Sequence, residues 1–64
     1  MLELFVYVQT TGVAVAKFIG NNHQVLLKAA NGFFPEGYSF SLDVGQLVVP
    51  EDLQEIHVFD VVYN

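Results

Sequence analysis

The chain has 64 residues, of which 53% are hydrophobic and only 14% are charged, and its formal net charge is −5. Ordinary soluble domains contain about 25% charged residues, so the surface of this protein is short of charge. Only 2 residues are lysine or arginine, too few to displace the counterions of a nucleic-acid backbone, and we therefore expect no direct nucleic-acid partner.

The size of the chain predicts a single domain over residues 1–64, because there is no room for a second core. The chain has no cysteine, so disulfides cannot stabilise it, and oligomerisation or dense packing has to do so. No apolar run approaches the roughly 18 residues of a membrane span. An acidic residue, Glu3, stands where a signal peptide has basic ones. We therefore expect a cytoplasmic protein with no membrane partner.

Valine, phenylalanine and tyrosine are abundant, and these residues favour strands over helices. The first half of the chain gives three predicted strands, each closed by a turn: residues 2–9 with a turn at 10–12, residues 13–19 with a hairpin signal at 20–22, and residues 24–30 with a turn at 31–32.

An aromatic-rich loop follows in the stretch NGFFPEGYSF, residues 31–40, around a turn at Pro35-Glu36-Gly37. Neighbouring residues of an extended chain point in opposite directions, so one of Phe33 and Phe34 faces the core and the other faces outward. Exposed aromatic side chains tend to mark interaction sites. We therefore predict that Phe33, Phe34 and Tyr38 contact a partner or ligand; the alternative is that both phenylalanines only close the end of the core.

The second half of the chain is also predicted to form strands. Residues 38–44 alternate between apolar and polar side chains, which is typical of a sheet with one solvated face. Residues 46–49 continue as a strand, and Pro50 begins one short helical turn near 50–54, because proline and acids suit a first helical turn. Residues 55–63 are the last predicted strand.

These elements predict an all-β fold, a small antiparallel barrel or sandwich of five to six strands. A single helical turn just before the final strand resembles the arrangement of SH3-like barrels, and an OB-like barrel is the nearest alternative. The chain has no tryptophan and lacks the acidic-aromatic motif of peptide-binding SH3 domains. Recognition of proline-rich peptides is therefore not expected.

The two terminal strands are apolar on both faces, which a one-sided sheet cannot bury. The alternative to self-association is that loops cover the second faces of two central strands. Burial of a phenylalanine or tyrosine is worth about 1.5–3 kcal/mol, a large amount for a small domain. We therefore predict a homo-oligomer, most simply a twofold dimer, with an interface formed by Phe5, Tyr7, His57, Phe59, Val61 and Tyr63.

The sequence contains no arrangement of residues that predicts catalysis. His23 and His57 lack the spacing of metal ligands, and the glycines fall at predicted turns without forming a phosphate-binding motif. We therefore expect no enzyme activity, no metal site and no cofactor.

Four acids fall within ten positions near the end of the chain: Glu51, Asp52, Glu55 and Asp60. One interpretation is a solvated turn whose acids suit a helix N-terminus. The functional interpretation is an acidic patch that docks on a basic protein surface, with Glu51, Asp52 and Glu55 as contact residues.

Together these features favour a non-enzymatic, oligomeric interaction protein, an accessory or inhibitory factor that binds a larger protein through its aromatic loop and acidic turn. One alternative is a nucleotide-like small molecule bound between subunits by the three loop aromatics with Asn21, Asn22 and His23. Another is a structural subunit of a larger assembly whose edge strands pair. The small size and unusual composition suggest an accessory gene of a virus or mobile element.

Overall fold

A computed structural model describes residues 1–59 of the chain. Asp60, Val61 and Tyr63, which were predicted to belong to the last strand or to contact surfaces, lie outside the described residues. The elements that the structure describes are β1 (Leu2–Val8), β2 (Ala14–Gly20), α1 (His23–Phe33), β3 (Tyr38–Ser41) and β4 (Gln54–His57). No helix within residues 1–59 is long and apolar enough to cross a membrane.

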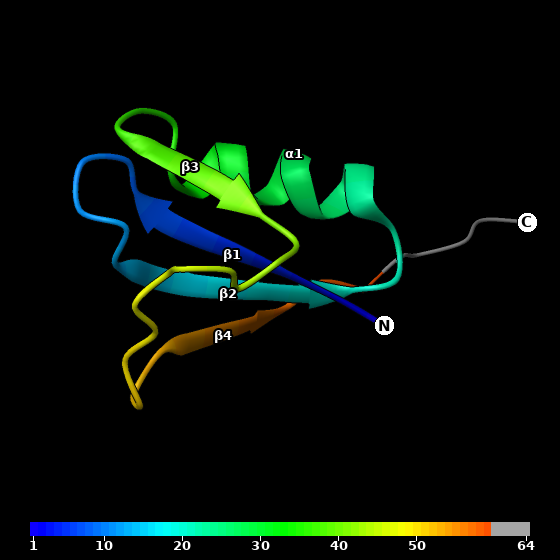
Figure 1. Ribbon diagram of the computed structural model, residues 1–64. Helices are drawn as coiled ribbons and strands as arrows, with labels where there is room; N and C mark the ends of the chain where they lie inside the picture. The colour runs from blue at the N-terminus through cyan, green and yellow to red at the C-terminus, as the bar shows by residue number, and fades with distance from the viewer. Residues whose placement is uncertain (60–64) are drawn as a thin grey trace, which may run out of the picture.

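The four strands form one mixed sheet in the order β3-β1-β2-β4 (Figure 1). The β1–β2 hairpin lies in the centre, β3 pairs antiparallel with β1, and β4 pairs parallel with β2. A β-bulge interrupts the hairpin between Val6 and Tyr7. Within residues 1–59 the sheet therefore has two edges, one at β3 and the other at β4.

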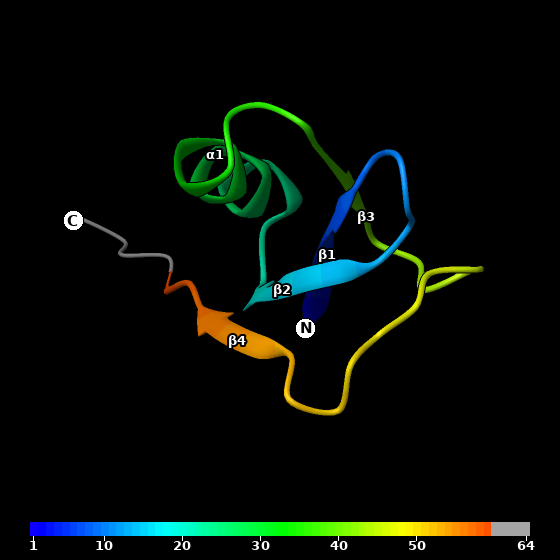
Figure 2. The ribbon, with the colours of Figure 1, turned by 90° about the vertical axis from the view of Figure 1, so that its left-hand side faces the viewer.

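Helix α1 covers one face of this sheet, and the main core lies between them (Figure 2). Alternate residues of a strand point to the same face, so β1 and β2 contribute Leu4, Val6, Ala16 and Phe18 to this side. These side chains are buried together with two residues one helical turn apart on α1, Leu26 and Ala30.

The opposite face is crossed by the β3–β4 connection, residues 42–53, which joins the two edges of the sheet (Figures 1 and 2). Two backbone hydrogen bonds hold this connection against the start of β2: Ala14 N–H donates to Val48 O at 2.8 Å, and Val48 N–H donates to Gly12 O at 3.0 Å. Phe5 points to this face, opposite Leu4 and Val6, and only 5% of its surface is exposed.

The predicted third strand, residues 24–30, is wrong, because this segment lies inside α1. The expected hairpin turn at Gly20-Asn21-Asn22 instead joins the end of β2 to the helix, which begins at His23. Asn22 is its N-cap, and the side-chain oxygen accepts hydrogen bonds from Gln24 N–H at 3.0 Å and Val25 N–H at 3.2 Å. These bonds satisfy backbone donors that have no partner within the first turn of a helix.

The predicted barrel is also wrong, because the sheet is open and residues 1–59 contain four strands and one helix. The predicted strand at 46–49 makes only a single bridge, between Val48 and Val13. The expected helical turn near 50–54 is a non-helical turn, after which β4 begins at Gln54. The broader prediction of a small, sheet-dominated domain is confirmed.

Candidate interaction surfaces

The aromatic loop packs around Phe18 at one end of the core. The Phe18 ring makes edge-to-face contacts with Phe33 and Phe34, at centroid distances of 5.8 Å and 6.3 Å, and Phe34 contacts Tyr38 in the same way at 5.0 Å. Phe34 is half-buried, whereas 68% of Phe33 is exposed. Of the two phenylalanines, Phe34 therefore faces the core and Phe33 faces solvent.

Residues 31–33 of the predicted aromatic loop belong to α1, and the rest of the loop follows directly from the end of the helix. Phe34 is the C-cap of the helix, and its backbone N–H donates to Ala30 O at 2.8 Å. Gly37 then adopts a φ of +80°, a left-handed conformation that glycine adopts without steric cost, and the chain enters β3. Asn21, Asn22 and His23 lie at the other end of α1, about 16 Å away along a helix of 11 residues. One copy therefore does not bring them together with Phe33.

A charged cluster lies on the sheet face opposite the helix. Lys17 Nζ is 3.1 Å from a carboxylate oxygen of Glu3 and 3.6 Å from one of Glu55, so a single lysine links β1, β2 and β4. The same Nζ lies 5.8 Å from the centre of the Phe5 ring. The hydrogen bond to Glu3, supported by the charges of Glu3 and Glu55, raises the pKa of Lys17 above its ordinary value of 10.5, although partial burial opposes the shift.

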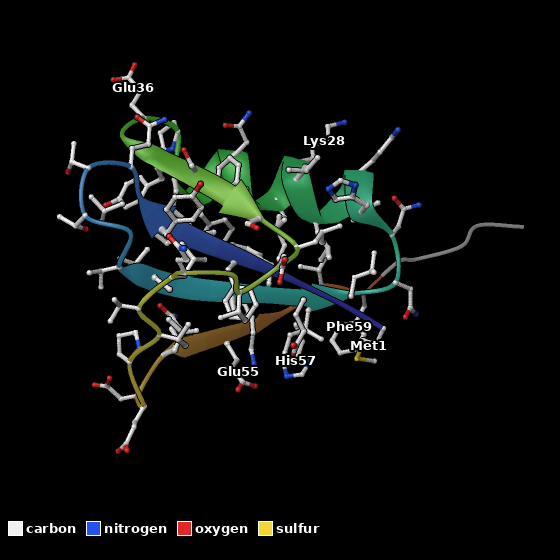
Figure 3. All side chains as sticks on the ribbon, viewed as in Figure 1. Met1, Lys28, Glu36, Glu55, His57 and Phe59 are labelled. Atoms are coloured by element: carbon white, nitrogen blue, oxygen red, sulfur yellow. The ribbon has the colours of Figure 1, made fainter. Side chains whose placement is uncertain are left out.

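Glu55 pairs with Lys17 in this cluster, but much of its side chain stays exposed. The Lys17 side chain is 17% exposed, but the Glu55 side chain is 52% exposed and makes the longer of the two ion pairs. Figure 3 shows Glu55 and His57 projecting from β4 toward the same side. Both therefore lie at an edge of the sheet where a further molecule can reach them.

A small pocket opens beside His57, between the start of β1 and the end of β4. Its volume is about 210 Å³, and Met1, Ile19 and Phe59 are among its lining residues. The ring planes of His57 and Phe59 are nearly parallel, with centroids 6.5 Å apart, and Met1 lies next to Phe59 (Figure 3). Sites for small molecules usually measure about 300–1,000 Å³, so this pocket is smaller than most of them.

The β3–β4 connection combines exposed apolar and exposed acidic side chains. It exposes Leu42, Val44, Val48 and Val49, and 59% of Val48 is accessible. It also exposes three acids, Asp43, Glu51 and Asp52, and it contains no lysine or arginine. A partner that matches this surface needs both basic and apolar groups.

The structure separates the predicted contact residues into two groups. Phe33, Phe34 and Tyr38 lie at the end of α1 and the start of β3, whereas Glu51 and Asp52 lie on the connection that crosses the other face (Figures 1 and 2). Among the predicted interface residues, His57 and Phe59 are exposed, Tyr7 is half-buried, and Phe5 has little surface to offer a partner.

The sequence did not predict that the aliphatic residues of the connection are exposed. Alternation placed Leu42 and Val44 on the inner face of a strand, but β3 ends at Ser41. There the Ser41 hydroxyl donates to Asp43 O at 2.7 Å and accepts from Asp43 N–H at 3.1 Å, and an Asp43 carboxylate oxygen accepts from Gly45 N–H at 3.2 Å. The spacing Ser-x-Asp-x-Gly was the available signal for these two side-chain turns.

Among residues 1–59, no three histidine, aspartate or glutamate side chains gather closely enough to hold a metal ion. Comparison of the chain with protein-family models, with curated proteins and with solved structures found no match. A function for this protein is therefore inferred from the surfaces described above.

Proposed function

We propose that this protein acts by binding a larger protein, as an accessory or inhibitory factor, and that the β3–β4 connection is its contact surface. The observation that carries the proposal is the composition of that connection. Four exposed aliphatic side chains and three exposed carboxylates occupy one short segment that has no basic residue.

The partner we expect is a protein with a basic surface around an apolar patch. Exposed aliphatic side chains provide contact area once water is excluded, and charges at the rim direct the encounter and select the partner. Charge supports this assignment. Lys17 already contacts two carboxylates, whereas Asp43, Glu51 and Asp52 form no ion pair within residues 1–59. The negative charges of these three carboxylates are therefore available to a partner in solution.

The fixed position of the segment also supports binding. Both backbone hydrogen bonds of Val48 anchor the connection to Gly12 and Ala14, so its exposed side chain is presented from a held backbone. A surface that is already ordered loses less conformational entropy when it binds.

The test is affinity capture of partners with wild-type protein and with variants of the connection, followed by measurement of binding with the purified partner. We expect E51K/D52K and Val48→Asn to weaken binding, the first by about tenfold or more. Glu36→Lys, which reverses one charge instead of two, is the control, because Glu36 is an exposed acid on the loop before β3 (Figure 3).

A second measurement places the contact. A reagent that joins carboxylates to lysines is expected to link Asp43, Glu51 or Asp52 to lysines of the purified partner. The double variant reverses two charges and E36K reverses one. A loss of binding free energy in E36K that is half or more of the loss in E51K/D52K would show that only net charge matters and would overturn the assignment. Cross-links confined to Glu36 would do the same.

A further inference from the structure

The outer edge of β4 has no partner among residues 1–59, and Figure 1 shows β4 at the border of the sheet. Unpaired strand edges are templates for pairing with another chain unless proline, a bulge or a covering segment blocks them. Residues 54–57 contain no proline, and three of the four are exposed.

The backbone of β4 shows which groups point outward. Val58 N–H donates to Ile19 O at 2.8 Å, so the backbone groups of Val58 point toward β2. Backbone groups alternate in direction along a strand, so those of Ile56 also point toward β2, and those of Glu55 and His57 point away from it. Glu55 and His57 therefore hold the backbone donors and acceptors of this edge that have no strand partner among residues 1–59.

We propose that β4 pairs antiparallel with β4 of a second copy, about a twofold axis, with Glu55 opposite His57 of the partner copy. When two β4 strands pair about a twofold axis through their outward backbone groups, three registers place the axis at or between Glu55 and His57. One sets Glu55 opposite Glu55 of the partner copy, where two carboxylates repel each other. Another sets the two His57 residues opposite each other and leaves Glu55 opposite Phe59. Only the third sets an imidazole donor opposite a carboxylate.

This register also suits the apolar side of the edge. It is centred on Ile56, so the two Ile56 side chains meet on the face that α1 covers, where each already packs against the core cluster. The Ile56 pair is then of the non-hydrogen-bonded type, in which side chains approach most closely. On either side of Ile56, Glu55 of one copy lies opposite His57 of the other. The two residues of each such pair form two backbone N–H···O hydrogen bonds with each other.

The edge at β3 has no feature that selects one register of pairing. Residues 38–41 of β3 are YSFS, without a charged side chain, so charge does not select a register there. The proposal does not rest on the proposed binding function, since the β3–β4 connection and the β4 edge use different residues. Loss of the partner protein and loss of the dimer are therefore measured independently.

Sedimentation velocity over a wide range of concentration tests the dimer. Opposite changes at one exposed position give the clearest result. His57→Lys replaces the imidazole with a full positive charge and is expected to tighten the dimer by about twofold to thirtyfold, counting both symmetric pairs, whereas His57→Glu is expected to weaken it similarly. His57→Pro removes an outward N–H without disturbing the pairing with β2 and is expected to weaken the dimer.

His23 supplies the matched control, because it is the other exposed histidine and lies at the start of α1. H23K and H23E should leave the dimer unchanged. A monomer at every concentration, equal effects of H57K and H57E, or assemblies larger than two copies would overturn the proposal.

Single cysteines test the register in a chain that otherwise has none. The Cα atoms of a non-hydrogen-bonded pair lie about 4.5 Å apart, within the range of a disulfide. Ile56→Cys should therefore oxidise to a covalent dimer. Gln54→Cys should not, because the two copies of residue 54 would be offset by about 13 Å along the strands. Rapid cross-linking of Q54C with none of I56C would refute this register.

Discussion

Adding one methyl group at Gly20 is expected to destabilise the fold, although the same change at Gly32 is expected to stabilise it. A Cβ at Gly20 would lie 2.9 Å from Leu26 Cδ2 and 3.0 Å from the carbonyl oxygen of Val58. Leu26 is fully buried, so its side chain has little room to move. The oxygen belongs to the backbone that leaves β4. At residue 20, β2 is thus in close contact with both α1 and the backbone at the end of β4.

Overpacking of this kind costs about 1–3 kcal/mol, and the lower entropy of the unfolded alanine variant offsets about 0.4–1 kcal/mol of that. We therefore expect Gly20→Ala to lower the free energy of unfolding by about 1–2 kcal/mol. A domain of 64 residues has about 3–10 kcal/mol in total, so this loss is readily measured. Gly32 lies in α1, and a Cβ there would meet nothing within 4 Å. Gly32→Ala should raise the free energy by about 0.5–1 kcal/mol.

The assay is urea unfolding of the wild type and both variants at one protein concentration, followed by circular dichroism. The midpoints should move in opposite directions while the m-value stays the same. A neutral or stabilising Gly20→Ala, or equal losses in both variants, would refute the claim that Gly20 is required by close packing.

Two further predictions concern the helix cap and the charged cluster. Asn22→Ala removes the acceptor for Gln24 and Val25 N–H and should cost about 0.5–2 kcal/mol in urea unfolding. Asn21→Ala, at the exposed neighbouring position, should change stability by less than about 0.5 kcal/mol; equal losses would contradict the cap. Lys17→Met should cost about 1 kcal/mol at neutral pH, where Lys17 is charged. Because folding raises the pKa of Lys17, its contribution is complete below pH 10.5 and is lost as the pH rises through the raised value. The difference from wild type should therefore shrink at alkaline pH, whereas Lys28→Met, on the exposed side of α1, should show no such trend.

Much of the sheet was predictable because its strands carry a local signal. Residues 2–8 and 14–20 each contain several β-branched or aromatic residues and are separated by a turn, so these two strands could be predicted from neighbouring residues alone. The pattern of the next segment was ambiguous. HQVLLKAANGF is short and apolar enough for a strand, and the capping role of Asn22 was the local signal that favoured a helix.

The candidate surfaces were less predictable. The exposure of Phe33 rather than Phe34 depends on where α1 ends and on the packing of both rings against Phe18, which is distant in the sequence. The ion pairs of Lys17 with Glu3 and Glu55 depend on strand order, since the three residues come from three different strands.

The sequence by itself determined the acidic charge, the excess of apolar residues and the first two strands, because these depend on composition and on neighbours along the chain. Only the tertiary structure decided that the sheet formed by residues 1–59 is open, that β4 lies beside β2 in parallel, and that the connection crosses the second face. These features result from contacts between residues far apart in the sequence, whose free energies no local pattern encodes. The edge at Glu55 and His57, which is unpaired among residues 1–59, is one consequence of that arrangement.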